Sequence, residues 1–317
     1  MNILITGSSG QIGTNLGLAL LARGEKVLGI DKRANSWTDR FPTQIAALHT
    51  AAGAAELSRA AASFKPHVIV HLAAWAKVHQ LVKEPEKAFE NVAMMQGSLQ
   101  AARETGAAFI FGSSREVYGD VIRNLTHESM TDFVVAESPY SASKIAGEAF
   151  VSSFARCYRV PTLVFRFSNV YGRYDNDLAR MERVIPLFVR NIWEEKPITV
   201  FGREKMLDFT YIDDCVAGIS AGIDALLNES GPHMVRDQTI NLACGEGHTL
   251  FELVSYIEKA TGKMASATWL PSQTGEVTRY VADITKARAL LTYEPRTPLP
   301  KGIAQYVAWC KSTGFLI

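Results

Sequence analysis

Short apolar runs alternate with longer stretches of helical periodicity through the first half of the chain. The apolar runs predict strands at 2–6, 26–31, 67–73, 107–112 and 161–167. The longer stretches predict helices at 11–23, 85–105 and 139–158. The strands are apolar on both sides, as in Val68-Ile69-Val70, which is typical of a parallel sheet covered by helices on both faces. We therefore expect an α/β fold with a doubly wound parallel sheet.

The second half is less regular and richer in proline. It predicts strands near 198–201 and 239–243, and helices near 177–195, 213–227, 249–261 and 284–291. We expect a smaller mixed α/β C-terminal lobe that binds the substrate, with domains at 1–169 and 170–317. The chain is expected to cross between them more than once, with segments near 207–244 returning to the first domain.

A glycine-rich turn joins the first strand to the first helix. Its sequence is Gly7-Ser8-Ser9-Gly10-Gln11-Ile12-Gly13. Glycines at this spacing allow a tight turn, a close approach of a pyrophosphate to the backbone, and close packing of helix on strand. The helix N-terminus adds free N–H groups and a partial positive charge. This position predicts a Rossmann-type dinucleotide site.

An acidic residue, Asp31, ends the second strand. Its carboxylate can accept hydrogen bonds from the adenosine ribose hydroxyls and would repel a 2′-phosphate, which favours NAD over NADP. Lys32 and Arg33 follow at once and could soften that preference. The alternative is that Asp31 only ends the strand.

Tyr140 and Lys144 lie four residues apart and therefore on one face of a predicted helix. A free tyrosine has a pKa near 10, too high for a base at neutral pH. A nearby ammonium and a positive nicotinamide ring would lower that pKa, so that the phenolate could take a hydroxyl proton. The alternative is an ordinary helix surface.

Two serines, Ser113 and Ser114, end a strand on the side where open α/β sheets bind ligands. A serine hydroxyl there can orient a reacting oxygen toward Tyr140. The alternative is that both serines only start a turn.

Composition narrows the possible partners. The chain has 317 residues and a net charge of +1, which argues against nucleic acid as the main partner. No apolar stretch approaches the roughly 20 residues needed to cross a bilayer, and no basic leader precedes the first strand, so we expect a cytoplasmic protein. The four cysteines and seven histidines show no metal-ligand spacing, so we expect no metal and buried cysteines.

Together these motifs resemble the extended short-chain dehydrogenase/reductase superfamily, which contains the nucleotide-sugar epimerases and dehydratases. The resemblance covers nearly the whole chain. It includes His71-Leu72-Ala73-Ala74, Ser113-Ser114, Val117-Tyr118-Gly119, the Tyr140/Lys144 pair, Arg166-Phe167-Ser168-Asn169-Val170-Tyr171-Gly172 and Phe209-Thr210-Tyr211-Ile212-Asp213-Asp214.

The resemblance implies a role for each matching residue. Ser114 would orient the substrate, Tyr140 would be the base, and Lys144 its electrostatic partner and a ribose ligand. Leu72, Ala73 and Ala74, with Asn35 and Ser36 after Asp31, would belong to the cofactor site, and Asn169 would meet the substrate pyrophosphate. The resemblance also implies a homodimer that pairs the helices at 85–105 and 139–158 in a four-helix bundle.

The chain departs from the family at residues that normally hold the substrate. Leu207 and Gln273 stand where arginines usually clamp the diphosphate. Losing both removes two charge-assisted contacts, each worth about 1.5–3 kcal/mol. Arg203, Lys205 or Arg279 could substitute; otherwise the substrate is not an ordinary nucleoside-diphosphate sugar. The usual aspartate that contacts adenine is also missing near His49-Thr50-Ala51.

Arg115 and Glu116 bear on the reaction. The resemblance implies that a glutamate at position 116 can abstract a proton next to a transient ketone, as dehydratases and decarboxylases do. The standard 4,6-dehydratases place an aspartate where this chain has Arg115. The alternative is that Glu116 only supports the site from outside.

The leading hypothesis is an NAD-dependent nucleotide-sugar epimerase that acts at sugar position 4. The alternatives are a dehydratase that uses Glu116 as base and a dehydrogenase of a non-nucleotide sugar or polyol. A protein that only senses the dinucleotide is the non-enzyme alternative, although such proteins tend to lose the Tyr140/Lys144 pair.

Overall fold

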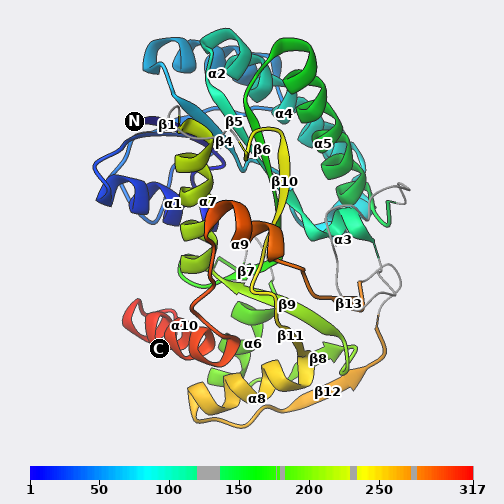
Figure 1. Cartoon of the computed structure of the whole chain (residues 1–317). Helices are drawn as coiled ribbons and strands as arrows, with labels where there is room; N and C mark the ends of the chain where they lie inside the picture. Colours follow the sequence, from blue (N-terminus) through cyan, green and yellow to red (C-terminus); the bar gives the residue numbers. More distant parts are fainter. Residues whose placement is uncertain (120–135, 176, 179–182, 229–233, 273–276, 317) are drawn as a thin grey trace.

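A computed structural model of the chain describes residues 1–119, 136–175, 177–178, 183–228, 234–272 and 277–316 (Figure 1). Its larger sheet has seven strands, and every registered pair is parallel. The strand order is β10 (Gln238–Leu242), β6 (Thr162–Phe167), β5 (Ala108–Ser114), β4 (Val68–His71), β1 (Asn2–Thr6), β2 (Lys26–Asp31) and β3 (Thr43–Ile45). The order reverses between β1 and β4, so the sheet is doubly wound, as the sequence predicted.

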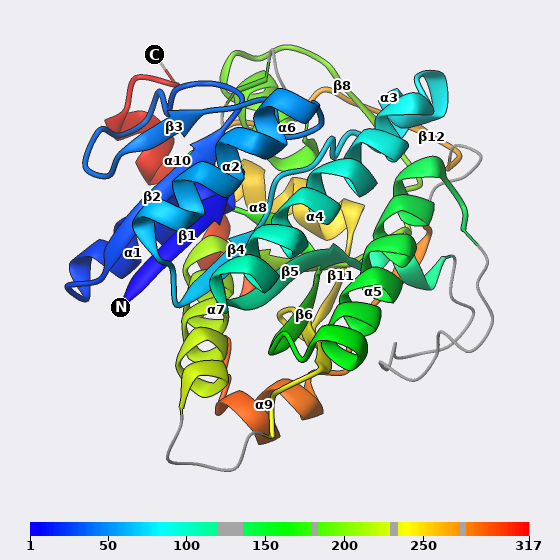
Figure 2. The same cartoon turned by 90° about the horizontal axis from the view of Figure 1, so that it is seen from above.

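Helices cover both faces of this sheet (Figure 2). One layer contains α2 (Ala51–Phe64), α4 (Glu86–Thr105) and α5 (Pro139–Tyr158), which pack side by side. The other contains α1 (Gln11–Ala22), α7 (Ile212–Leu227) and α9 (Thr285–Leu291). Strands β4 and β6 are therefore buried along their whole length, which explains the unbroken apolar runs Val68-Ile69-Val70 and Leu163-Val164-Phe165 within them.

A second, smaller lobe lies at the carboxyl ends of the large sheet (Figure 1). Its strands are β7 (Asn169–Tyr171), β9 (Met206–Tyr211), β11 (Gly247–Thr249) and β13 (Arg279–Tyr280), with β8 (Ile198–Phe201) paired to β12 (Ala267–Leu270). Its helices are α6 (Val184–Trp193), α8 (Leu250–Thr261) and α10 (Leu299–Ser312). Two short helices, α3 (Val78–Lys83) and the 3₁₀ turn η1 (Arg115–Tyr118), follow β4 and β5.

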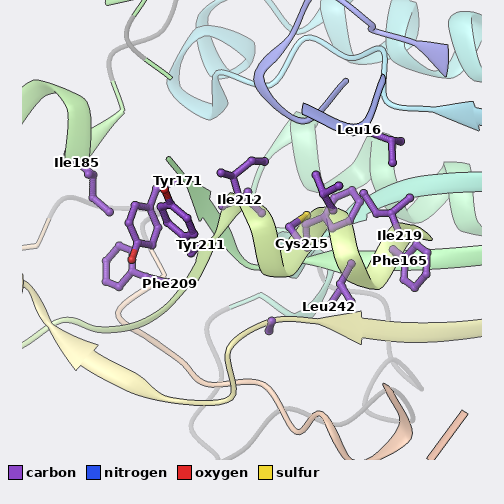
Figure 3. Close-up of a cluster of buried hydrophobic side chains, with 14 of the residues drawn as sticks. Leu16, Phe165, Tyr171, Ile185, Phe209, Tyr211, Ile212, Cys215, Ile219 and Leu242 are labelled. Atoms are coloured by element: carbon purple, nitrogen blue, oxygen red, sulfur yellow. The ribbon is translucent and has the colours of Figure 1, made fainter. Parts of the chain in front are cut away.

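One continuous core joins the lobes along α7 (Figure 3). Ile212, Cys215 and Ile219 of this helix are fully buried, near Phe165 of the large sheet at one end and Tyr211 at the other. A buried carboxylate adds a polar link: Asp208 of β9 accepts hydrogen bonds from the backbone N–H groups of Cys244, at 3.0 Å, and Gly245, at 2.9 Å. The end of β10 is thereby tied to the smaller sheet.

The observed elements confirm the predicted fold class and most of the predicted segments. The helix predicted at 139–158 and the strand at 198–201 have the observed bounds. The predicted helix at 177–195 is observed as α6, and part of its predicted start lies outside the described residues. The predicted domain division at residue 169 stays a prediction. One expectation was wrong, because Cys157 at the end of α5 is exposed.

Candidate active site

A cleft of about 590 Å³ opens at the carboxyl ends of the large sheet, at the point where the strand order reverses. Its lining comes from the glycine turn after β1, the segment after β4, the end of β5, the start of α5, and β7 with the start of α6. In this volume range a small-molecule ligand can bury most of its surface.

Two glycines of the turn leave no room for a side chain against neighbouring backbone, and a third leaves helix N–H groups open to a phosphate. Gly7 has a φ of +75°, and an added Cβ would lie 2.7 Å from the backbone N of Ala73. A Cβ on Gly13 would lie 2.4 Å from the carbonyl oxygen of Gly7. Gly10, the N-cap of α1, offers no side chain to the first helical N–H groups, so those donors remain for a phosphate. Leu72, Ala73, Ala74, Gln11 and Ile12 also line this part of the cleft.

Asp31 is fixed at the edge of this turn. Its Oδ2 accepts a hydrogen bond from the backbone N–H of Ser9 at 3.1 Å, and the residue lines the cleft beside Lys32. Asn35 lies behind the turn, where its amide donates to the Ser8 carbonyl at 3.1 Å and to Thr14 Oγ1 at 3.0 Å. Ser36 is exposed. Asn35 therefore supports the turn, and direct contacts of Asn35 and Ser36 with a cofactor stay predictions.

Tyr140 and Lys144 lie together on the buried face of α5, at the floor of the cleft. Ser138 and Ser141 form a capping box with Pro139 in the first turn, which fixes where the helix begins. Burial raises the pKa of Tyr140 to about 12, although a hydrogen bond with the Ser114 side chain opposes this. Ser114 and Tyr140 are therefore close enough to share one substrate oxygen.

Lys144 is held by the backbone of β5, and its expected effect on the pKa of Tyr140 together with a nicotinamide ring stays a prediction. Its Nζ donates to the Gly112 carbonyl at 2.8 Å and lies 5.8 Å from the centroid of the Tyr140 ring. Burial lowers the pKa of Lys144 to about 8, because desolvation outweighs the opposing charge of Glu148. The chain's own groups thus favour a neutral tyrosine.

Ser113 lines the cleft and also links β5 to α5 through a hydrogen bond. Its hydroxyl donates to Glu148 Oε1 at 2.6 Å, and Glu148 also accepts two hydrogen bonds from the Arg166 guanidinium. Because Ser113 is buried and engaged below the cleft, Ser114 is the better placed of the two serines to meet a substrate. A direct substrate contact from Ser113 stays a prediction.

Arg115 and Glu116 form an ion pair at the cleft wall, with 2.9 Å between Arg115 Nη2 and Glu116 Oε1. Both side chains are about 13–14% exposed. Arg115 Nη1 is enclosed and has no hydrogen-bond partner among the residues that the structure describes, a costly state for a charged donor. The Glu116 carboxylate is thus already engaged by a cation at the cleft wall.

The predicted substitutes for the clamp arginines lie elsewhere. Arg203 is exposed, with its guanidinium over the Phe251 ring, and Lys205 is buried; neither is among the residues that line the cleft. Leu207 is part of the core between the lobes. Asn169 does line the cleft, and its amide donates to the Asp208 carbonyl at 2.8 Å. Gln273 lies outside the described residues.

Sequence reasoning missed two cleft residues, Arg183 and Trp75. Arg183 precedes α6, and its Nη1 donates to Gln11 Oε1 at 2.6 Å and to the Val170 carbonyl at 3.2 Å. The stretch around Arg183 carries no motif, so only the tertiary fold brings it to the glycine turn. Trp75 directly follows the motif at 71–74, and this position next to a cofactor-binding motif could have predicted that it lies in the cleft.

Fold and site define a dinucleotide-dependent enzyme of the short-chain dehydrogenase/reductase type. The chain belongs to the NAD dependent epimerase/dehydratase family, whose model matches residues 3–236. NAD is accordingly its cofactor, and the glycine turn with Asp31 are the residues that would hold it.

Several relatives resemble the chain over nearly its full length. It is 30% identical to an uncharacterized UDP-glucose epimerase, YtcB, of Bacillus subtilis, over 98% of each chain. The UDP-glucose 4-epimerase of Thermotoga maritima, solved with UDP-glucose, is 26% identical with a TM-score of 0.89 over 99% of both chains. The UDP-glucuronic acid 4-epimerase of Bacillus cereus, solved with UDP-glucuronic acid and NAD, is 28% identical, with a TM-score of 0.85, and the match covers 99% of this chain and 100% of that one.

In the part of the chain that the structure describes, no helix is both long and apolar enough to span a membrane.

Proposed function

We propose that this protein is an NAD-dependent epimerase that inverts position 4 of a nucleotide-linked sugar. The observation that carries the proposal is the contrast at the cleft wall: Tyr140 and Ser114 share a hydrogen bond at the floor, whereas Glu116 is held by Arg115. The first pair equips the site to oxidise and restore a hydroxyl. In the second pair a cation already engages the carboxylate that elimination would need as its base. The names of similar proteins, epimerases of UDP-glucose and UDP-glucuronic acid, support the same choice.

In this mechanism Ser114 and Tyr140 bind the oxygen at position 4 together. NAD, when bound, would accept the hydride from carbon 4 and give it back to the opposite face of that carbon, and its positive charge would favour the phenolate. Tyr140 takes the hydroxyl proton, and that charge offsets the pKa of about 12 that burial gives the phenol. Lys144, fixed by Gly112, supports the proton transfer. The sugar then turns within the cleft, and Tyr140 returns the proton to the same oxygen, so the product is an isomer of the substrate.

Arg183 and Arg115 take the part of the absent clamp arginines in this proposal. Both line the cleft, and both act electrostatically on Tyr140. Arg183 lies on the side of the glycine turn and Arg115 beside the reacting oxygen. A diphosphate or an acidic sugar substituent would satisfy such donors.

The test is a product assay with UDP-glucose, UDP-glucuronic acid and their thymidine analogues, using purified protein and NAD. A product of unchanged mass, resolved from the substrate by chromatography, is the expected result. Loss of one water would establish the dehydratase alternative, and steady NADH release a dehydrogenase. If no nucleotide sugar reacts but a free sugar or polyol does, the proposed substrate class is wrong.

A homodimer through α4 and α5 is part of the same proposal. These neighbouring helices expose large apolar side chains, including Phe89 (77% exposed), Phe150 (44%) and Tyr158 (45%). We expect a dimer mass in light scattering and a monomer for Phe89→Lys. A wild-type protein that stays monomeric at micromolar concentration would refute it.

A further inference from the structure

The indole of Trp75 lies in the cleft on the side of Asp31, where no role has yet been given to it. Its position is fixed twice. The backbone N–H of Trp75 donates to Asn91 Oδ1 at 2.7 Å, and Asn91 Nδ2 donates back to the Trp75 carbonyl at 3.1 Å. The indole Nε1–H donates to Glu90 Oε2 at 2.6 Å, which sets the orientation of the ring.

One face of this ring is turned toward the end of β2. Lys32, the residue after Asp31, places its Nζ 3.1 Å from the centroid of the Trp75 ring. At that distance the Lys32 ammonium itself occupies the face, and Lys87 Nζ lies 4.9 Å from the same centroid. Lys32 is itself an exposed residue on a flexible stem, so its ammonium can leave the ring without disturbing the fold.

We call the part of the cleft around Asp31 and Trp75 the compartment beside Asp31. His49 lies with its ring centroid 6.3 Å from that of Trp75, and both His49 and Leu48 are among the residues that line the cleft. The family's adenine-binding aspartate is missing from this segment, as noted above, so the base needs other partners. An aromatic face is such a partner, because every base has a π-face on which to stack.

We propose that Trp75 is the stacking platform for the adenine of NAD and that Lys32 gives up the ring face when the base arrives. The ribose hydroxyls are held by Asp31, and adenine is bonded to that same ribose. The base must therefore lie in the compartment next to Asp31, and Trp75 is its largest flat surface. This inference rests on the NAD dependence of the family and not on the choice of epimerisation.

The first test compares cofactor fragments by isothermal titration calorimetry. Trp75→Leu should weaken the binding of NAD and ADP-ribose about 10-fold, with a range of roughly 5- to 100-fold. It should leave nicotinamide mononucleotide, which lacks adenine, within about 2-fold. Trp75→Phe should lose less than Trp75→Leu because it keeps an aromatic face. The matched control is Trp269→Leu in β12, away from the cleft, which should bind all three ligands as the wild type does.

The second test measures stacking of the base on Trp75 by tryptophan fluorescence, and it does not depend on catalysis. A base stacked on an indole quenches its emission, so AMP and NAD should both quench the wild-type fluorescence. That part of the signal should vanish in Trp75→Phe and persist in Trp269→Phe. Equal weakening of nicotinamide mononucleotide and ADP-ribose in Trp75→Leu, or quenching that survives in Trp75→Phe, would overturn the proposal. Either result would leave the product assay of the proposed function unaffected.

Discussion

The two walls of the cleft are built by different means. The wall on the side of β1 and β4 is made of backbone and small residues, and Gly7 and Gly13 meet other backbone atoms with no room for a Cβ. The wall on the side of β7 and α6 is made of long side chains, such as Arg183, that reach in from distant segments. The first wall is specified by local sterics, so it can be read from a short motif. The second wall is specified by how the lobes pack, so it can change its charges while the fold stays the same.

The largest effect should come from the residue at the floor, between the two walls. Tyr140→Phe removes the phenol hydroxyl that shares a hydrogen bond with Ser114. We expect turnover to fall about 10³-fold, within the 10²–10⁴ range of general acid–base catalysis. NAD affinity, measured by calorimetry, should stay unchanged. Tyr158→Phe, exposed on the same helix, is the control and should turn over normally. A Tyr140→Phe enzyme with a tenth of the normal rate would exclude Tyr140 as the base.

The backbone wall should not tolerate one added methyl group. Gly13→Ala would place a Cβ 2.4 Å from the Gly7 carbonyl oxygen, so the turn must move. We expect a stability loss of about 1–3 kcal/mol and the loss of most NAD affinity. Urea unfolding and NAD titration would measure the two effects. Gly97→Ala in α4, where the nearest atom is the Ala54 side chain at 3.4 Å, should cost little; equal losses in both variants would refute the steric argument.

A buried histidine beneath the same wall should make stability depend on pH. Burial lowers the pKa of His71 to about 3, while its Nδ1 lies 2.8 Å from Thr6 Oγ1. The unfolded chain takes up this proton near pH 6.5 and the folded chain only near pH 3, so stability is lost as the pH falls between them. The slope is about 1.4 kcal/mol per pH unit for one full proton. Urea unfolding at pH 7, 6 and 5 should show it.

His71→Asn should flatten that slope even if it lowers stability at pH 7. Asp208, whose pKa burial raises to about 6, contributes the opposite trend: its stability is present at low pH and is lost as the pH rises from 3.8 to 6. Asp208 is common to both proteins, so the difference between their slopes isolates His71. Parallel pH profiles would show that His71 is not the titrating group.

The smallest effect should come from the Arg115–Glu116 ion pair of η1, the turn that follows β5. Glu116→Gln removes a charge that is already paired with Arg115, so we expect turnover within about 10-fold of the wild type. Product mass should remain that of an isomer. Arg115→Met should lower turnover more, because it leaves Glu116 without its cation. A Glu116→Gln variant as inactive as Tyr140→Phe would make Glu116 a catalytic residue and reopen the dehydratase alternative.

This difference between the walls also decides what could be predicted from the sequence. Strand and helix periodicity predicted the large sheet apart from its edge strand β3, and it predicted α5 to the residue; in the structure Pro139 and a serine cap mark the start of that helix. The segments α2 and α10 were missed: α2 is rich in alanine, with Leu57 as its large buried apolar side chain, and α10 begins among Pro298 and Pro300. Arg183 and Leu207 could not be placed, since their positions follow from the packing of α6 and β9.

The path of the chain between the sheets has a consequence for how such an enzyme changes over evolution. After α7 the chain returns to the large sheet as β10 and crosses back as β11, and Asp208 ties the crossing to β9. The smaller lobe is therefore not encoded by one continuous segment. A single recombination event in the gene cannot replace it and also keep β10, the edge strand of the large sheet. A new substrate must instead be acquired residue by residue, in the kind of side chains that line the wall beside α6.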